Sequence, residues 1–197
     1  MRLVRDERGQ YQNSIETEIA IRHAFLNLMK TKDLDKISIA DIAKGARIER
    51  STFYSHYQNI DYLVMDISKV QFDEIRNVLV RNGDDILASL PAAVWCLITT
   101  INDFPYGVII RSKYWLPFSF AISWGVLNVL ATDKLIADDQ EMLDRKKIRL
   151  DHFWSGVMYT LHGWINSRFE CSEEDLIAVL TETALQFVQK IRNENSK

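Results

Sequence analysis

The scarcity of proline and glycine is the feature of this chain that most restricts its fold. Only three prolines and seven glycines interrupt its 197 residues. The stretches between them are rich in Leu, Ile, Ala, Lys, Arg and Glu, and most of these residues favour helix over turn or strand. We therefore expect an all-α fold.

The cysteines and the apolar segments exclude several classes of protein. Cys96 and Cys171 lie far apart and outside any Cys-x-x-Cys pair, so we expect neither a disulfide framework nor a zinc site. The polar N-terminus lacks the apolar run of a secretory signal. The most apolar segment, residues 116–131, is shorter than the roughly 20 residues that cross a bilayer. We expect a cytoplasmic protein that needs no cofactor, no metal and no membrane.

The charge of the chain is unevenly distributed. Its net charge is −3, yet residues 1–60 hold ten Lys and Arg against eight Asp and Glu. The remaining residues hold fourteen against nineteen. The basic excess therefore lies in the N-terminal part, which has the sign required for contact with phosphate groups.

Apolar spacing predicts short helices within the first 60 residues. The first helix has a buried face of residues three and four apart, namely Ile21, Ala24, Phe25, Leu28 and Met29. A second helix starts after Ser38, whose hydroxyl can cap it, with Asp41 three residues further on. It ends at Gly45 and Ala46, and a third helix begins near Glu49. Two short helices joined by a tight turn form a helix-turn-helix.

Longer helices follow in the rest of the chain. Asp61 is the expected cap of a fourth helix, which stops at the Asn-Gly-Asp sequence of residues 82–84. Further helices are expected over residues 85–102, 106–113, 118–131, 141–168 and 172–192. Ser172 and Asp175 resemble a capping box at the start of the last one.

The third predicted helix combines two kinds of residue within residues 48–57. Ile48 and Phe53 supply a buried side, and Tyr57 is assigned either to that side or to the surface. The opposite side presents short or donor-tipped side chains, which are Arg50, Ser51, Thr52, Tyr54 and His56. A helix with such a face fits the major groove of DNA, because its exposed groups can reach phosphates and base edges.

This segment resembles the TetR family of regulators. The matching pattern is Ser38-Ile39-Ala40-Asp41-Ile42-Ala43 followed by residues 48–57, and Asn59, Asp61 and Leu63 continue it. The resemblance covers residues 19–63. It implies an N-terminal three-helix DNA-binding domain and a C-terminal helical domain that dimerises and binds a ligand. We assign residues 1–13 to a flexible arm, 14–60 to the helix-turn-helix domain and 61–197 to the regulatory and dimerisation domain.

The resemblance implies that the third helix contacts double-stranded operator DNA. Arg50, Ser51 and Thr52 would face bases or nearby phosphates, and Tyr54 would donate its hydroxyl to a phosphate. Arg50 is our candidate for base readout, because arginine can donate two parallel hydrogen bonds to guanine.

The resemblance also implies contacts at the edges of the motif. His56 and Tyr57 would hold the DNA backbone, and Ser38 would present its hydroxyl and N–H groups to a phosphate. Two positions depart from the family pattern. Arg47 replaces the usual glycine of the turn, so either Arg47 is left-handed or the turn shifts toward Gly45. Ile60 replaces a common lysine, which removes one phosphate contact.

Two apolar stripes near the C-terminus predict a homodimer through the last two helices. The first stripe consists of Phe153, Val157, Leu161, Trp164 and Ile165. The second consists of Leu176, Ile177, Leu180, Ala184, Phe187, Val188 and Ile191. Both are wide enough for a four-helix bundle across a two-fold axis, and the resemblance implies the same interface. Such a dimer would place two recognition helices about one DNA turn apart.

Aromatic residues cluster between residues 95 and 124, where they either fill the core or line an effector pocket. A small apolar or aromatic effector is the ligand that such a pocket would take. The candidate ligand-binding residues are Trp95, Tyr106, Trp115, Phe118 and Trp124.

Catalytic motifs are absent from the sequence: it has no Gly-x-Ser-x-Gly, no His-Glu-x-x-His and no glycine-rich phosphate loop. Our hypothesis is a regulator without enzyme activity, a repressor that binds a palindromic operator as a dimer and is released by a small-molecule effector. Two alternatives stay open, an activator of the same fold and a helical adaptor that uses the helix-turn-helix for protein contacts.

Overall fold

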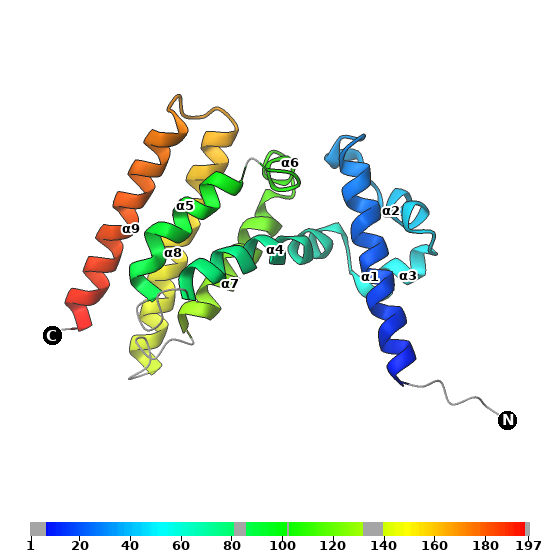
Figure 1. Cartoon of the computed structure of the whole chain (residues 1–197), viewed down its shortest axis with the longest axis horizontal. Helices are drawn as coiled ribbons and strands as arrows, with labels where there is room; N and C mark the ends of the chain where they lie inside the picture. The colour runs from blue at the N-terminus through cyan, green and yellow to red at the C-terminus, as the bar shows by residue number, and fades with distance from the viewer. Residues whose placement is uncertain (1–6, 81–85, 102, 132–139, 196–197) are drawn as a thin grey trace. The chain divides into compact units, whose positions relative to one another are not determined.

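The helices of the chain form two compact units. The structure is a computed structural model that describes residues 7–80, 86–101, 103–131 and 140–195, and within these ranges every regular element is a helix (Figure 1). The all-α prediction is therefore confirmed. The division between the units falls between Val64 and Met65.

The first unit consists of α1 (Glu7–Met29), the short 3-10 helix η1 (Leu34–Lys36), α2 (Ile39–Ala46), α3 (Arg50–His56) and the start of α4 (Ile60–Val80). Packing of α1 against α2 buries Ile21, Ala24, Phe25 and Met29, as their spacing predicts. Helix α1 already begins at Glu7, although we expected residues 1–13 to form an arm. Helix formers such as Glu7 and Gln10 extend it, and residues 1–6 lie outside the described residues.

A reciprocal capping box begins α2, as predicted from Ser38 and Asp41. The Ser38 hydroxyl accepts a hydrogen bond from the Asp41 backbone N–H at 3.2 Å, and the Asp41 carboxylate accepts one from the Ser38 backbone N–H at 2.8 Å. Both bonds satisfy N–H groups that the first turn of a helix leaves without partners.

The turn between α2 and α3 is built on Arg47. This residue adopts left-handed backbone angles, φ 58° and ψ 42°, so the turn has not shifted to Gly45. The N–H of Ile48 donates to the Ala43 carbonyl at 3.0 Å and closes the end of α2. Gly45 has a different role, because a Cβ there would come within 3.1 Å of the Ala24 Cβ. It lets α2 approach α1 closely.

The start of α4 differs from the prediction. Asn59, not Asp61, supplies the capping oxygen, since its Oδ1 accepts a hydrogen bond from the Tyr62 N–H at 3.2 Å. Ile60 is buried and begins the helix, which leaves Asp61 inside the first turn. Asp61 lies there at the positive end of the helix dipole.

The second unit contains the remainder of α4, η2 (Ile86–Ser89), α5 (Leu90–Thr100), α6 (Tyr106–Ile110), α7 (Trp115–Ala131), α8 (Gln140–Ile165) and α9 (Glu173–Asn195). Two helix pairs carry most of its packing: α5 lies along α9, and α7 lies along α8 (Figure 1). Their facing sides are apolar, with Leu97, Phe118 and Trp154 among the buried residues.

The connection between α8 and α9 is held by local contacts. Ser167 takes a left-handed conformation, and the Arg168 N–H donates to the Gly163 carbonyl at 2.8 Å. Phe169 then folds back so closely that a Cβ on Gly163 would meet its ring at 2.8 Å. After this connection Ser172 and Asp175 form the predicted capping contacts of α9.

The left-handed backbone of Arg47 generates a stability prediction. Arg47→Gly removes the Cβ that disfavours this conformation, so we expect the free energy of unfolding to rise by about 1 kcal/mol. Lys44→Gly, the same change in the last turn of α2, is expected to lower it by about 1 kcal/mol. Urea unfolding followed by circular dichroism measures both. A loss of stability in Arg47→Gly would contradict the assigned turn.

The two sides of α3 generate a second stability prediction. Phe53 is fully buried, so Phe53→Ala should lower the free energy of unfolding by about 3–5 kcal/mol through lost burial and a cavity. The exposed Tyr54 provides the matched change, and Tyr54→Phe should alter stability by less than about 0.5 kcal/mol. Equal losses in the two variants, measured by the same urea titration, would show that α3 is oriented differently.

Candidate nucleic-acid interface

Helix α3 has one buried side and one exposed side. Phe53 and Tyr57, four residues apart, are buried and their rings lie 5.8 Å apart. The exposed side chains follow the same spacing on the opposite side and are Arg50, Ser51, Tyr54 and Ser55. Thr52 is half-buried between the two sides. The exposed side therefore carries one cation and three hydroxyl groups.

The ring of Tyr54 packs against the neighbouring core residue Phe53. Its ring meets the Phe53 ring edge to face, with centroids 5.9 Å apart and planes at 88°, while half of the residue stays exposed. An aromatic contact of this geometry restricts the ring without using its hydroxyl. The hydroxyl remains at the surface, where a phosphate contact needs it.

Two predicted contact residues at the end of α3 lie against the protein itself. Tyr57 is only 7% exposed and belongs to the core, which decides between the two assignments that the sequence left open. The side chain of His56 is 12% exposed, and its Nδ1 lies 3.3 Å from the Glu18 carboxylate of α1. His56 thus joins the end of α3 to α1.

Ser38 is engaged within the cap of α2. Its hydroxyl donates to the Asp41 carboxylate at 2.6 Å, and the Lys32 ammonium approaches the same oxygen at 2.7 Å. The hydrogen bond from Lys32, followed by those from Ser38, holds the pKa of Asp41 well below its usual range. Asp41 therefore stays ionised, and its carboxylate binds the Ser38 hydroxyl and N–H that a phosphate would otherwise use.

Residues outside our predicted set also lie beside this surface. Ser55 shares the exposed side of α3, although its hydroxyl donates to the Thr52 carbonyl at 2.7 Å. Arg47 and Lys44 are exposed cations at the turn that precedes α3. Two sequence signals could have indicated these residues. They are the four-residue spacing of Ser51 and Ser55 and the basic residues of the turn.

The five candidate ligand-binding aromatics do not share one environment. Tyr106 and Phe118 are buried and in contact, with ring centroids 5.9 Å apart. Trp115 stacks on His162 at 4.1 Å. Trp95 and Trp124 are exposed, so they do not line a buried pocket. Only the first pair lies in the interior of the second unit.

Tyr106 and Trp154 each place a polar group in the interior of the second unit. Burial, together with the charge of Glu74, raises the pKa of the Tyr106 hydroxyl to about 12. Trp154 is 1% exposed, and its indole N–H has no hydrogen-bond partner among the described residues. An unsatisfied buried donor costs about 1–3 kcal/mol, so a hydrogen bond from this N–H to an acceptor would be favourable.

Residues 7–80, 86–101, 103–131 and 140–195 contain neither a membrane-spanning helix nor a metal site made of three or more His, Cys, Asp or Glu side chains.

Comparison with curated proteins finds helix-turn-helix regulators. The chain is 38% identical over 66 residues to the HTH-type dhaKLM operon transcriptional activator DhaS of Lactococcus lactis, a match that covers 34% of this chain and 35% of DhaS. It is 24% identical over 183 residues to the uncharacterized HTH-type transcriptional regulator YxbF of Bacillus subtilis, covering 88% of this chain and 45% of YxbF. The chain thus spans less than half the length of either relative. No family model matches it.

Comparison with solved structures identifies the fold. The TetR family repressor AlkX from Dietzia sp. strain DQ12-45-1b superposes with a TM-score of 0.63 at 17% identity, covering 88% of this chain and 97% of AlkX. RolR, solved in complex with resorcinol, superposes with a TM-score of 0.54 at 16% identity, covering 92% of this chain and 95% of RolR. The predicted resemblance is confirmed in its fold: this chain has the helix-turn-helix fold of the TetR family of transcriptional regulators.

Proposed function

We propose that this protein is a DNA-binding transcriptional regulator that represses by occupying a palindromic operator as a dimer. The observation that carries the proposal is the exposed side of α3, where Arg50, Ser51 and Tyr54 project from a helix anchored by the buried Phe53. Such a helix enters the major groove as a rigid unit. The fold shared with the repressor AlkX and the sequence similarity to the transcriptional activator DhaS support DNA-binding transcriptional regulation.

The residues of α3 divide between base readout and backbone contact. Arg50 reads a base edge, because its guanidinium can donate two parallel hydrogen bonds to guanine. The Tyr54 hydroxyl donates to a phosphate, and Ser51 and Thr52 contact bases or phosphates beside it. Tyr57 is left out of this interface because it is buried. His56 and Ser38 remain weaker candidates, since Glu18 and Asp41 already engage them.

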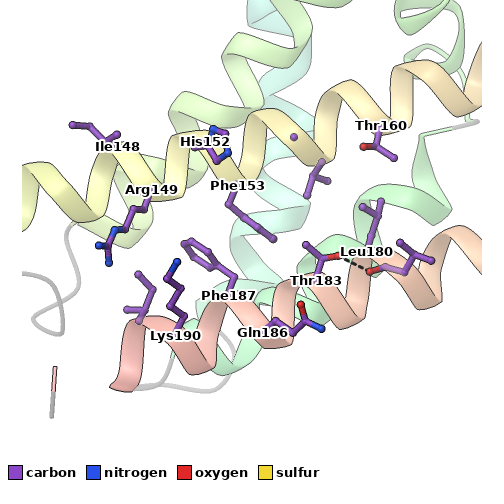
Figure 2. A pocket seen from close by; sticks show the side chains of 14 residues that line it. Ile148, Arg149, His152, Phe153, Thr160, Leu180, Thr183, Gln186, Phe187 and Lys190 are labelled. Carbon is purple, nitrogen blue, oxygen red and sulfur yellow. Dashed lines mark hydrogen bonds between the residues drawn. The ribbon is translucent and has the colours of Figure 1, made fainter. Parts of the chain in front are cut away.

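A homodimer through α8 and α9 completes the proposal. The sides of these helices that face each other are apolar, and a groove of about 720 Å³ runs between them (Figure 2). A second copy covers this groove and forms a four-helix bundle. The two α3 helices then reach half-sites about one DNA turn apart.

An effector that binds the second unit releases the DNA. Trp154 offers an N–H that no described residue accepts, in a core that also contains the rings of Tyr106 and Phe118. A small aromatic molecule with an oxygen acceptor fits this chemistry. It releases the operator only if it binds the DNA-free state more tightly than the DNA-bound state.

The DNA contacts lead to a binding prediction. Arg50→Ala should weaken binding to the DNA flanking the protein's own gene by about 10–100-fold, since a bidentate base contact contributes about 1–3 kcal/mol. Tyr54→Phe should weaken it by a smaller factor through the lost phosphate contact. Arg76→Ala removes an exposed cation of α4 and should leave affinity unchanged. Gel-shift titration at several salt concentrations measures all three.

The same titration separates the alternatives. Wild-type affinity that falls steeply with salt supports phosphate contact. Failure of the wild-type protein to retain the DNA, with tight binding of a protein partner, would favour the adaptor. Rising transcription from a reporter when the protein is expressed would favour an activator, which is what DhaS is named.

The proposed effector chemistry leads to a thermal prediction. Resorcinol, the ligand in the RolR structure, is a suitable first probe because its oxygens can accept the Trp154 N–H. We expect it to raise the melting temperature of the wild-type protein and to lower its DNA retention. Trp154→Phe keeps an aromatic ring at this position but removes the donor, so the shift should shrink. No shift at saturating resorcinol would contradict a phenolic effector.

A further inference from the structure

The basic excess of the N-terminal part comes from one short segment. Residues 1–60 hold ten Lys and Arg against eight Asp and Glu, and residues 44–50 hold three of these cations against one acid. The other residues up to 60 therefore hold seven of each. The three cations are exposed, and we call them the turn cations: Lys44 in the last turn of α2, Arg47 in the turn and Arg50 at the start of α3.

The turn cations differ from other cations of the first unit because no acid pairs with them. Lys32 lies 2.7 Å from the Asp41 carboxylate, and Lys36 lies 3.3 Å from that of Asp33. Within residues 7–80, 86–101, 103–131 and 140–195, the side chains of the turn cations make no ion pair and no hydrogen bond. The acid of the segment, Glu49, is exposed and makes no side-chain capping bond to α3. The turn cations therefore remain available to an external anion.

Arg47 occupies a position that favours glycine. Its φ of 58° lies in the left-handed region, where a Cβ comes too close to the following carbonyl oxygen. Its side chain makes no hydrogen bond, ion pair or ring contact with any described residue. A residue in an unfavourable conformation whose side chain has no such contact is a candidate for a role in binding.

The order of the elements places two of the turn cations beside a phosphate backbone. In a helix-turn-helix bound to DNA, the first helix crosses the backbone and the second lies in the major groove. The turn between them therefore lies at the edge of the groove, which phosphates line. Lys44 and Arg47 belong to the end of α2 and to this turn, whereas Arg50 begins α3. The first two are thus placed for phosphates and the third for the groove.

We propose that Lys44 and Arg47 bind phosphates of the operator backbone at the edge of the groove that α3 enters. Arg47 can hold a phosphate with two parallel hydrogen bonds, and Lys44 adds a single charge near it. This inference rests on the proposed DNA binding and extends the interface beyond α3. It supplies a phosphate contact before α3, whereas the buried Ile60 cannot supply one after it.

The salt dependence of DNA binding tests this contact. Fluorescence anisotropy of the full chain, with a labelled duplex from the DNA flanking its own gene, gives the affinity between about 50 and 200 mM salt. Arg47→Gly should lower the slope of log affinity against log salt concentration by about 0.9 per bound protomer, because one phosphate charge is no longer neutralised. Lys44→Gln should lower it similarly. At the lower salt concentration, either change should weaken binding about fivefold per bound protomer.

Conservative changes at Arg47 separate charge from backbone conformation. Arg47→Lys keeps the charge and the Cβ, so it should retain the salt slope of the wild type. Arg47→Gln keeps the Cβ but removes the charge, so its slope should fall as in Arg47→Gly. Arg76→Gln removes an exposed cation of α4 and should leave the slope unchanged. Equal slopes for Arg47→Lys and Arg47→Gln would overturn the role of the charge.

Stability distinguishes this role from a structural one. Arg47→Gly is expected to unfold less readily than the wild type, so it should gain stability while it loses affinity for DNA. A cation that only interacts with the negative end of the α2 dipole would give the opposite result. Its removal would lower stability and leave the salt slope unchanged, which would overturn the proposed contact.

An unrelated duplex of equal length distinguishes phosphate contact from base readout. Arg47→Gly should weaken binding to both duplexes by the same factor, whereas Arg50→Ala should mainly weaken binding to the duplex from the protein's own gene. A wild-type protein that binds neither duplex would overturn the proposed DNA binding itself. Wild-type binding with unchanged slopes in Arg47→Gly and Lys44→Gln would overturn this contact alone.

Discussion

Burial of Phe53 is the interaction on which the proposed interface depends. Helix α3 has only seven residues, and a helix of that length is not stable in water by itself. Phe53 is fully buried and Tyr57 packs beside it, so the unit holds α3 by one side. Helical geometry then directs Arg50, Ser51 and Tyr54 outward. The burial of Phe53 and the exposure of the polar side therefore both follow from the same orientation of α3 about its own axis.

The segment around α2 sets where α3 begins. Lys32, Ser38 and Asp41 form a compact network at the start of α2, and the left-handed Arg47 ends that helix. Gly45 allows α2 to lie close to Ala24 of α1. Each of these contacts restricts the movement of the backbone between α1 and α3. Together they keep the turn rigid, which a helix that must fit a groove of fixed width requires.

Some apolar side chains of the second unit are buried between its helices, and others stay exposed beside the groove. Helix α9 packs along α5, and α8 packs along α7, while the sides of α8 and α9 next to the groove keep apolar residues at the surface. Ile148 and Val179 are well exposed there. The buried Trp154 differs from these residues, because its indole N–H has no acceptor in the part of the chain that the structure describes. Association would bury the exposed apolar side chains, and a bound ligand with an acceptor would satisfy the Trp154 N–H.

Local sequence determined the helices, the capping boxes at Ser38 and Ser172, and the two-sided character of α3, because these depend on residues within about one helical turn of each other. Tertiary structure decided that Tyr57 is buried and that His56 meets Glu18, which lies 38 residues away. It also separated Trp95 and Trp124, which are exposed, from Tyr106 and Phe118 in the core. A ring or an imidazole suits core and surface alike, so only the packing of distant helices assigns it to one or the other.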